Sequence, residues 1–228
     1  MYNMAVWGIR SNITQMHKYC KVLYTMNKEQ RIRDILISNA VSLVAEGGFE
    51  IATTKAITYI SRDTDVKMNE VYIYRFFGSK ENLFAAAFHR LDREFLFVLH
   101  SAFAHTDLVA DDTEDAFYTA FLEIWDHVIN NEAKFRYYIR YYYSAYFVKL
   151  SLQEHLRLFD DIIGDFSHVF VADADVRSVM HSVLTTLLDF AVRVYNGDLE
   201  DNDQNRPHVF RVLRCTLSGY LKEQYKTN

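Results

Sequence analysis

The side chains best suited to contact phosphate lie between positions 69 and 83, in the string NEVYIYRFFGSKENL. Spacings of three and four divide the first part of this string into two faces of a short helix. One face is apolar and consists of Ile73, Phe76 and Phe77. The opposite face carries Val71, Tyr72 and Arg75. Two turns of helix are not stable alone, so neighbouring helices must hold this segment with its second face exposed.

A second helix is predicted to begin directly after this one. Gly78 can end the short helix, and Ser79 is a good N-cap for the next. Glu81 then lies in the first turn, where the helix dipole favours an acidic residue. Lys80 lies beside the unpaired backbone N–H groups of the same turn, which is a suitable position for a phosphate contact.

Two further helices are expected upstream. Apolar residues recur at helical spacing from Lys28 to Glu46, and a glycine pair follows. Thr53 or Thr54 can cap a second helix containing Ile57 and Ile60, and a polar turn leads from there to Asn69. Three helices with the third exposed form a helix-turn-helix domain, a fold that places the exposed helix in the DNA major groove.

The strings GGF at 47–49 and YIYRFFGSKENLF at 72–84, with the threonine pair between them, resemble the N-terminal domain of the TetR (tetracycline repressor-like) transcriptional regulators over about residues 28–90. The resemblance implies that Tyr74 and Lys80 contact phosphates and that Glu70, Val71 and Tyr72 face base edges. The full DNA-contacting set predicted in this way is Thr53, Thr54, Lys55, Lys67, Asn69, Glu70, Val71, Tyr72, Tyr74, Arg75 and Lys80.

Two features depart from the usual pattern of that family. The segment from Ile57 to Asn69 is longer than usual and has no glycine in the turn. Glu70 occupies a base-facing position, where it could accept a hydrogen bond from a cytosine amine but would repel a phosphate. These features motivate an alternative, in which a TetR-like co-regulator binds a protein partner rather than DNA.

Composition predicts an all-α fold with a small N-terminal domain and a larger helical body. The chain of 228 residues is 50% hydrophobic, has seven glycines and one proline, and shows no sustained strand-like alternation. Helical apolar spacing continues through residues 83–99 and 117–128. We therefore divide the chain into an N-terminal extension (1–27), a helix-turn-helix domain (28–80) and an effector-binding and dimerisation domain (81–228).

The charge distribution is consistent with this division. Residues 28–80 have a net charge of +1, and residues 81–228 have a net charge of −9. A less acidic head is expected if only the head meets a polyanion, although ordinary surface charge is the simpler explanation when the charges are taken without the motif. The first 27 residues contain no acidic residue. They are interpreted as an extension outside the family pattern or, alternatively, as a basic arm that reaches into the minor groove.

Aromatic residues make up most of the segment 135–147. Such a segment suits a core or a helix contact, and it also suits the wall of a ligand pocket. The resemblance implies a small-molecule effector bound in the body, whose identity the sequence does not give. The residues predicted to bind it are Trp125, Tyr138, Tyr142, Tyr146 and Phe190.

The last two helices are predicted to form a dimer interface. One spans Val176 to Tyr195, and Pro207 opens the other. The resemblance implies a four-helix bundle between two copies, and reading a palindrome requires two recognition helices about 34 to 36 Å apart. The predicted interface residues are Val183, Leu187, Phe210, Leu213 and Leu217. Alternatively, this pair of helices completes the core of a monomer.

The sequence gives little support to catalytic or metal-binding functions. The nine histidines are scattered, without the HExxH motif or zinc-ligand spacing, and neither a glycine-rich phosphate loop nor a GxSxG string occurs. We therefore expect no catalytic residues, no metal and no cofactor, although a buried polar triad in the body would reopen the enzyme hypothesis. Asp189 lies in an apolar stretch and is expected to be buried with a partner.

Nothing in the sequence suggests a membrane protein or an exported one. Cys20 and Cys215 are isolated, and no long uncharged apolar segment is present. The sequence thus predicts a cytoplasmic, homodimeric transcriptional repressor. Its expected partners are a palindromic operator of double-stranded DNA, a second copy of the chain and an unidentified small-molecule effector, with no membrane among them.

Overall fold

The structure is a computed structural model that describes residues 28–59, 68–104 and 113–226. Over these ranges the chain is helical, with one isolated antiparallel bridge between Phe170 and Leu221, so the all-α prediction is confirmed. The α-helices are α2 (Lys28–Gly47), α3 (Thr54–Tyr59), α4 (Val71–Phe77), α5 (Lys80–Ala104), α6 (Thr113–Ile129), α7 (Glu132–Tyr142), α8 (Ala145–Leu150), α9 (Leu152–Phe166), α10 (Val176–Tyr195) and α11 (Asn205–Ser218). Two 3-10 turns are η1 (Ser167–Val169) and η2 (Glu223–Tyr225).

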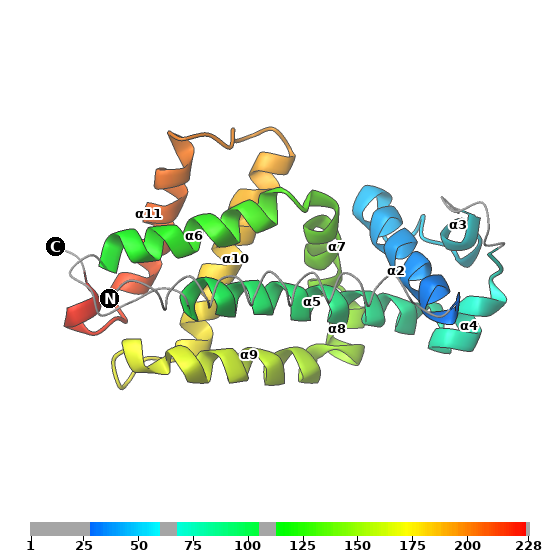
Figure 1. The fold of residues 1–228 in the computed structure, drawn as a ribbon, viewed down its shortest axis with the longest axis horizontal. Helices are drawn as coiled ribbons and strands as arrows, with labels where there is room; N and C mark the ends of the chain where they lie inside the picture. The colour runs from blue at the N-terminus through cyan, green and yellow to red at the C-terminus, as the bar shows by residue number, and fades with distance from the viewer. Residues whose placement is uncertain (1–27, 60–67, 105–112, 227–228) are drawn as a thin grey trace, which may run out of the picture.

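Helix α5 extends along most of the molecule and connects its two parts (Figure 1). The three head helices α2, α3 and α4 lie at its N-terminal end, and α6 and α9 run beside its remaining length. Helices α10 and α11 pack against each other at the end away from the head. With 25 residues, α5 is about 37 Å long, and among the described helices it is the one that reaches from the head to the far end of the body.

The helix boundaries agree closely with local sequence signals. Helix α10 has the predicted bounds, and α11 begins at Asn205, two residues before Pro207, which therefore lies in its first turn. Thr53 caps α3 by accepting a hydrogen bond from the backbone N–H of Ala56 at 3.1 Å. Helix α4 begins at Val71, whose N–H donates to the side-chain oxygen of Asn69 at 3.1 Å.

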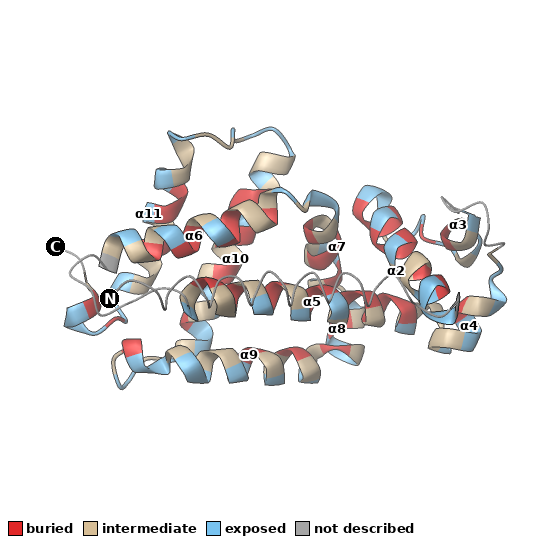
Figure 2. Ribbon diagram, viewed as in Figure 1, coloured by how far each residue is buried: buried red, intermediate tan, exposed pale blue. Residues whose placement is uncertain are grey.

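One continuous hydrophobic core joins the head to the body. Helix α2 packs against α7 as well as α5, and Arg140 of α7 donates a hydrogen bond to the backbone carbonyl of Val44. Figure 2 shows the buried residues on the faces that these helices turn toward one another. The proposed boundary after residue 80 falls at the start of α5, whose first turns bury Phe84 and Phe88 in this shared core.

The aromatic segment 135–147 forms part of this core. Phe88 stacks on Tyr138 and Tyr141 with ring centroids 4.9 and 4.7 Å apart. The hydroxyl of Tyr137 donates to the carbonyl of Phe84 at 2.7 Å. Burial raises the pKa of Tyr137 and Tyr138 well above the ordinary value, so both hydroxyls remain protonated donors.

None of the helices in the described ranges is both long and apolar enough to cross a membrane.

Candidate functional site

Helix α4 presents apolar and aromatic side chains at the surface of the head. Ile73 is fully buried and anchors the helix against its neighbours. On the outer side, Val71 is 63% exposed and Tyr74 is 56% exposed. Large side chains with this exposure have no role in the core of the chain, so they are available to a partner.

The start of α4 is fixed by contacts with α3. The hydroxyl of Thr54 donates a hydrogen bond to the carboxylate of Glu70. Tyr72 is partly buried and stacks on Phe76 at a centroid distance of 5.7 Å. Glu70 is exposed yet has a partner within the head, so its carboxylate has a defined position at the edge of this surface.

The cations of the head differ in how firmly they are held. Lys55 is exposed on α3. Arg75 is exposed as well, and it forms an ion pair with Glu29 at 2.5 Å. Lys80 is partly buried at the first position of α5, with its ammonium group 5.6 Å from the ring centroid of Phe84. Lys80 therefore combines a positive charge, a helix N-terminus and a restricted side chain, as a phosphate contact requires.

The turn between α4 and α5 sets the position of Lys80. Gly78 has φ +78°, and its N–H donates to the carbonyl of Tyr74 at 2.9 Å, which closes α4. Ser79 then caps α5 by accepting from the N–H of Asn82 at 3.1 Å. The predicted glycine-then-serine turn is thus present.

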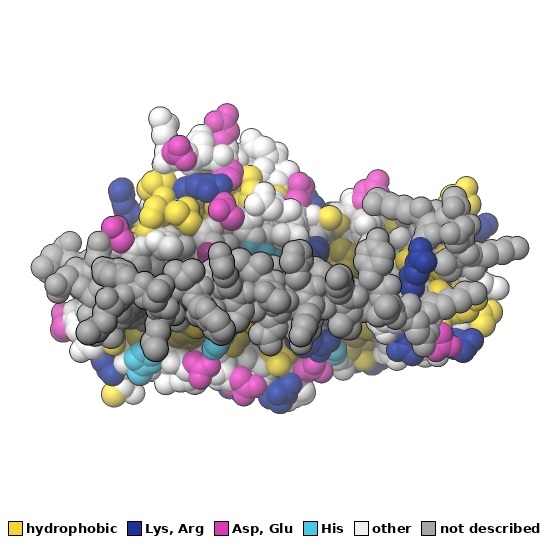
Figure 3. Space-filling model, viewed as in Figure 1, with side chains coloured by type: hydrophobic (Ala, Val, Ile, Leu, Met, Phe, Trp, Pro, Cys, Tyr) yellow, Lys and Arg dark blue, Asp and Glu magenta, His cyan; other side chains and the backbone are white. Residues whose placement is uncertain are grey.

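The structure gathers most of the predicted DNA-contacting residues on the head. Those exposed are Thr53, Lys55, Asn69, Glu70, Val71, Tyr74 and Arg75. Those partly buried are Thr54, Tyr72 and Lys80. Lys67 lies outside the described residues. Figure 3 shows apolar, basic and acidic side chains mixed among the described residues that are visible at the head end.

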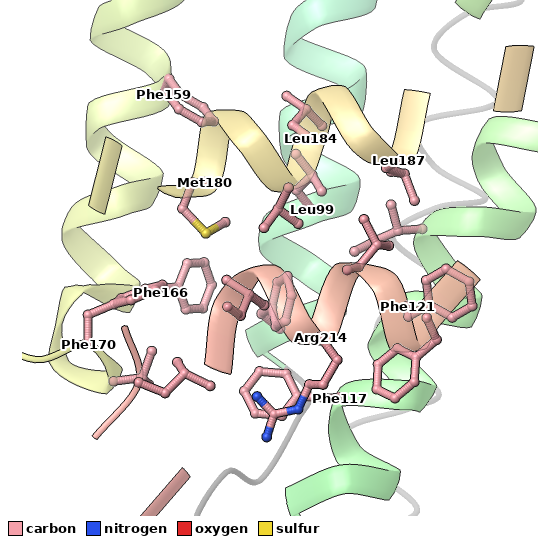
Figure 4. Close-up of a pocket in the computed structure, with 18 residues that line it drawn as sticks. Leu99, Phe117, Phe121, Phe159, Phe166, Phe170, Met180, Leu184, Leu187 and Arg214 are labelled. Atoms are coloured by element: carbon pink, nitrogen blue, oxygen red, sulfur yellow. The ribbon is translucent and has the colours of Figure 1, made fainter. Parts of the chain in front are cut away.

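The body contains an apolar cavity of about 90 Å³ at the end of α5 away from the head (Figure 4). Its walls come from α5, α6, α9, α10 and α11, and the bridge between Phe170 and Leu221 supplies part of one side. Phe117, Phe121 and Met180 are among the side chains that line it. Apolar cavities of this kind remain dry and accept apolar ligands.

Arg214 is the charged residue among the described side chains that line this cavity, and it was not among the residues predicted to bind a ligand. It is 8% exposed, and its guanidinium carbon lies 4.6 Å from the ring centroid of Phe117. A signal was available, because Arg214 lies four residues after Phe210 and three before Leu217, on the apolar face of its helix.

The five residues predicted to bind a ligand do not line this cavity. The indole N–H of Trp125 donates to Asp201 at 2.8 Å, an interaction that helps to lower the pKa of that carboxyl after the larger effect of Arg206. Tyr146 packs against Phe49, and Phe190 lies near His208. Tyr138 belongs to the polar cluster described below, and the Tyr142 hydroxyl lies 3.3 Å from Nδ1 of His181.

The five residues predicted for a dimer interface line the cavity instead. Leu187, Phe210 and Leu213 are buried within the chain, and Val183 and Leu217 are partly buried. The apolar faces of α10 and α11 are therefore directed inward. Asp189 of α10 is exposed, so the prediction that it is buried with a partner is wrong; it lies on the outer side of that helix.

A polar cluster is buried between α5, α7 and α9. The Nδ1 atom of His155 lies 3.0 Å from each carboxylate oxygen of Asp92, and the Tyr138 hydroxyl donates to the same carboxylate at 2.9 Å. All three residues are at most 3% exposed. Asp92 could have been noticed in the sequence, because it lies four residues after Phe88 and three before Phe95 on an apolar face.

This cluster is the polar triad that would reopen the enzyme hypothesis, and its chemistry is limited. Within the described residues, the only hydroxyl bonded to it is that of Tyr138, whose pKa is raised by burial and by Asp92. A protonated phenol that donates to a carboxylate is a poor nucleophile. The arrangement instead fastens three helices together through satisfied hydrogen bonds.

A second hollow of about 720 Å³ lies between α2 and the junction of α6 with α7. Polar side chains contribute much of its lining, and its cations already have partners: Lys134 contacts Glu94, and Arg136 contacts Glu132. Arg140 is bonded to a backbone carbonyl. The apolar cavity is therefore the better candidate for a ligand site in the body.

No protein-family model and no curated protein matches the sequence. Several solved structures do match. A TetR family transcription regulator from Marinobacter aquaeolei VT8 is 13% identical with a TM-score of 0.67, and the match covers 86% of this chain and 98% of the other. A TetR-family transcriptional regulator from Haemophilus influenzae Rd is 12% identical with a TM-score of 0.61, covering 86% and 100%.

A third similar structure is a TetR-like transcriptional regulator from Rhodococcus sp. RHA1, which is 18% identical with a TM-score of 0.58 and coverage of 82% and 94%. At these identities the similarity establishes the fold. The chain has the fold of TetR-family regulators over nearly the whole length of those proteins, in agreement with the resemblance seen in its motifs.

Proposed function

We propose that this protein is a ligand-responsive transcriptional repressor that binds a palindromic DNA operator as a homodimer in the cytoplasm. The observation that carries the proposal is the surface of α4, on which Val71 and Tyr74 are exposed, next to Lys80 at the start of α5. It lies in a chain that has the TetR-family fold.

In this proposal, α4 enters the major groove. Tyr74 and Lys80 contact phosphates, which set the register of the head on the duplex. Glu70, Val71 and Tyr72 face base edges and discriminate between sequences. Thr54 supports this role because its hydrogen bond fixes the Glu70 carboxylate, which can then accept from a cytosine amine without approaching a phosphate.

Helix α5 supplies a route from the body to the head. Leu99 and Phe103 line the cavity near its C-terminal end, and Lys80 begins the helix about 30 Å away. A ligand that favours one position of α5 would change the spacing of the two heads in a dimer. A difference in affinity of a few kcal/mol between the two states is sufficient to release the operator.

The test is a fluorescence-anisotropy titration of the purified protein against the intergenic DNA upstream of its own gene, with scrambled DNA as competitor and with salt varied. We expect specific binding by two protomers per site. Binding no tighter than to scrambled DNA would contradict an operator at that locus and would favour the protein-binding co-regulator.

Replacing Lys80 tests the proposed phosphate contact directly. We expect Lys80→Ala to weaken binding to specific and scrambled DNA alike and to reduce the slope of log affinity against log salt by about 1. The matched control is Lys149→Ala, which removes an exposed lysine on α8 of the body. An unchanged salt slope for Lys80→Ala would rule out the phosphate contact.

A further inference from the structure

The guanidinium of Arg214 has an unused hydrogen-bonding capacity at the cavity. Its Nε donates to the Glu114 carboxylate at 3.1 Å, and its Nη2 donates to the carbonyl of Tyr225 at 2.7 Å. Its Nη1 atom is buried and has no hydrogen-bond partner among the residues that the structure describes. In Figure 4 the nitrogen atoms lie beside Phe117, at one end of the group of lining side chains.

An unsatisfied N–H of a charged group is costly in apolar surroundings. The guanidinium cannot relieve this cost by losing its charge, because arginine remains protonated in proteins. An acceptor from outside the chain would relieve it, and a carboxylate is the acceptor that forms the strongest bond with a guanidinium. The remaining walls are apolar, so the rest of such a molecule must be a hydrocarbon.

We infer that the cavity binds an aliphatic carboxylate, with its head group on Nη1 of Arg214 and its hydrocarbon part between α5, α6, α10 and α11. This inference names the effector class of the proposed function and rests on it for the consequence at the operator. The binding itself does not depend on DNA and can be measured without it.

The volume of the cavity limits how much of the ligand's hydrocarbon chain can enter it. About 90 Å³ is less than the roughly 150 Å³ of an engineered cavity that accepts benzene. Lining side chains must therefore move to admit more than a few methylene groups. Met180 is suited to this because its unbranched side chain has three rotatable bonds. This fit makes affinity depend on chain length, rising by up to about fourfold per added methylene.

Glu114 is the group that opposes a carboxylate at this position. Its side chain is 43% exposed, whereas that of Arg214 is 9% exposed, so solvent screens the negative charge more than the positive one. Replacing Glu114 by Gln removes the competing charge. It gives a test of the inference that is independent of any variant at Arg214.

The experiment is isothermal titration calorimetry of the full chain without DNA, using hexanoate, octanoate and decanoate below their micelle concentrations, with octanol as the uncharged analogue of octanoate. We expect octanoate to bind about tenfold more tightly than octanol. Arg214→Gln should remove that preference by weakening octanoate alone. The matched control is Arg211→Gln, an exposed arginine on the same helix, which should behave as the unmodified chain.

Two further variants keep the test decisive. Glu114→Gln should raise the affinity for octanoate severalfold. If circular dichroism shows that Arg214→Gln is unfolded, the Glu114→Gln variant tests the carboxylate assignment without it. Leu184→Phe, which adds bulk to the cavity wall, should weaken octanoate and octanol together. Equal binding of octanoate and octanol, or no effect of Glu114→Gln, would overturn the carboxylate assignment. Absence of binding by every chain would overturn the site.

The anisotropy titration separates this inference from the proposed function. Octanoate should lower the affinity of the unmodified protein for the operator. It should not change the affinity of the Leu184→Phe variant for the operator. If the unmodified protein binds the operator but binds no carboxylate, the inferred ligand class is wrong and the proposed function as a DNA-binding regulator stands. If the protein binds carboxylates but never binds DNA specifically, the ligand class stands and the proposed DNA-binding function is wrong.

Discussion

Asp92 and Arg214 both lie on apolar helix faces, but they differ in how fully their hydrogen bonds are satisfied. The carboxylate of Asp92 accepts from Tyr138 and lies within hydrogen-bonding distance of His155 at both oxygens. Within the described part of the chain, Arg214 has partners for two of its nitrogens and none for the third. A complete buried network stabilises a unique arrangement of helices, whereas an incomplete one leaves a place for a ligand.

The completeness of the Asp92 network leads to a prediction about stability. Asp92→Ala leaves the buried Tyr138 hydroxyl and His155 ring without their acceptor and should lower the free energy of unfolding by about 3 kcal/mol or more. Urea denaturation followed by circular dichroism measures this change. The control, Asp161→Ala, removes an exposed acid that is 3.5 Å from Arg157 and should change stability by less than about 0.5 kcal/mol. Similar effects of the two variants would show that the cluster is not a structural fastening.

At the scale of elements, the turn between α4 and α5 decides how the head is presented. Gly78 adopts φ +78°, a region that costs a residue with a Cβ atom about 1 to 2 kcal/mol. The turn aligns the end of α4 with Lys80 at the start of α5. Its geometry, more than the net charge of the head, places the predicted phosphate contacts.

The conformation of Gly78 predicts opposite effects for two glycine substitutions. Gly78→Ala should lower the free energy of unfolding by about 1 kcal/mol or more, because alanine disfavours the left-handed region. Gly164→Ala should raise it by about 0.5 to 1 kcal/mol, because Gly164 lies within α9 and an added Cβ meets no atom within 4 Å. Thermal unfolding of both variants measures the difference. Destabilisation of equal size in both would argue against a special role for the turn at residue 78.

For the whole molecule, the inward direction of α10 and α11 restricts how two copies could pair. Val183 and Leu187 face the cavity, so a partner would meet the outer side of α10, where Ser182 and Asp189 are exposed seven residues apart. A dimer built there would leave each cavity within its own protomer. Ligand binding and dimerisation would then use opposite faces of the same helices.

This arrangement predicts a dimer that a charge on the outer face of α10 disrupts. Light scattering after size-exclusion chromatography should give twice the chain mass of 26.9 kDa. Ser182→Arg should shift the protein toward one chain mass, because it places two like charges across the symmetry axis. Ser38→Arg, on the exposed side of α2, is the matched control and should remain dimeric. A dimer unaffected by Ser182→Arg would place the interface elsewhere.

Local patterns in the sequence predicted the helices of the head, α5, α6, α10 and α11, together with the turn that joins α4 to α5, but not the division of residues 132–166 into α7, α8 and α9. Their signals are local: apolar spacing within one helix, the Thr53 cap, and the Gly78 and Ser79 pair. Residues 72–84, which include this turn, also carry the family resemblance. The described structure places most of the predicted DNA-contacting residues on the head. Short-range steric and capping preferences suffice for these predictions because each involves residues only a few positions apart.

The partner of each apolar helix face is known only from the tertiary structure. An apolar stripe on α10 or α11 suits a dimer interface and a cavity wall equally well, and only the packing of α5, α6 and α9 around them turned Val183 and Phe210 inward. Asp92 and His155 are 63 positions apart, as the pairing of α5 with α9 requires. Such contacts depend on how distant helices are brought together, which the spacing within any one helix does not encode.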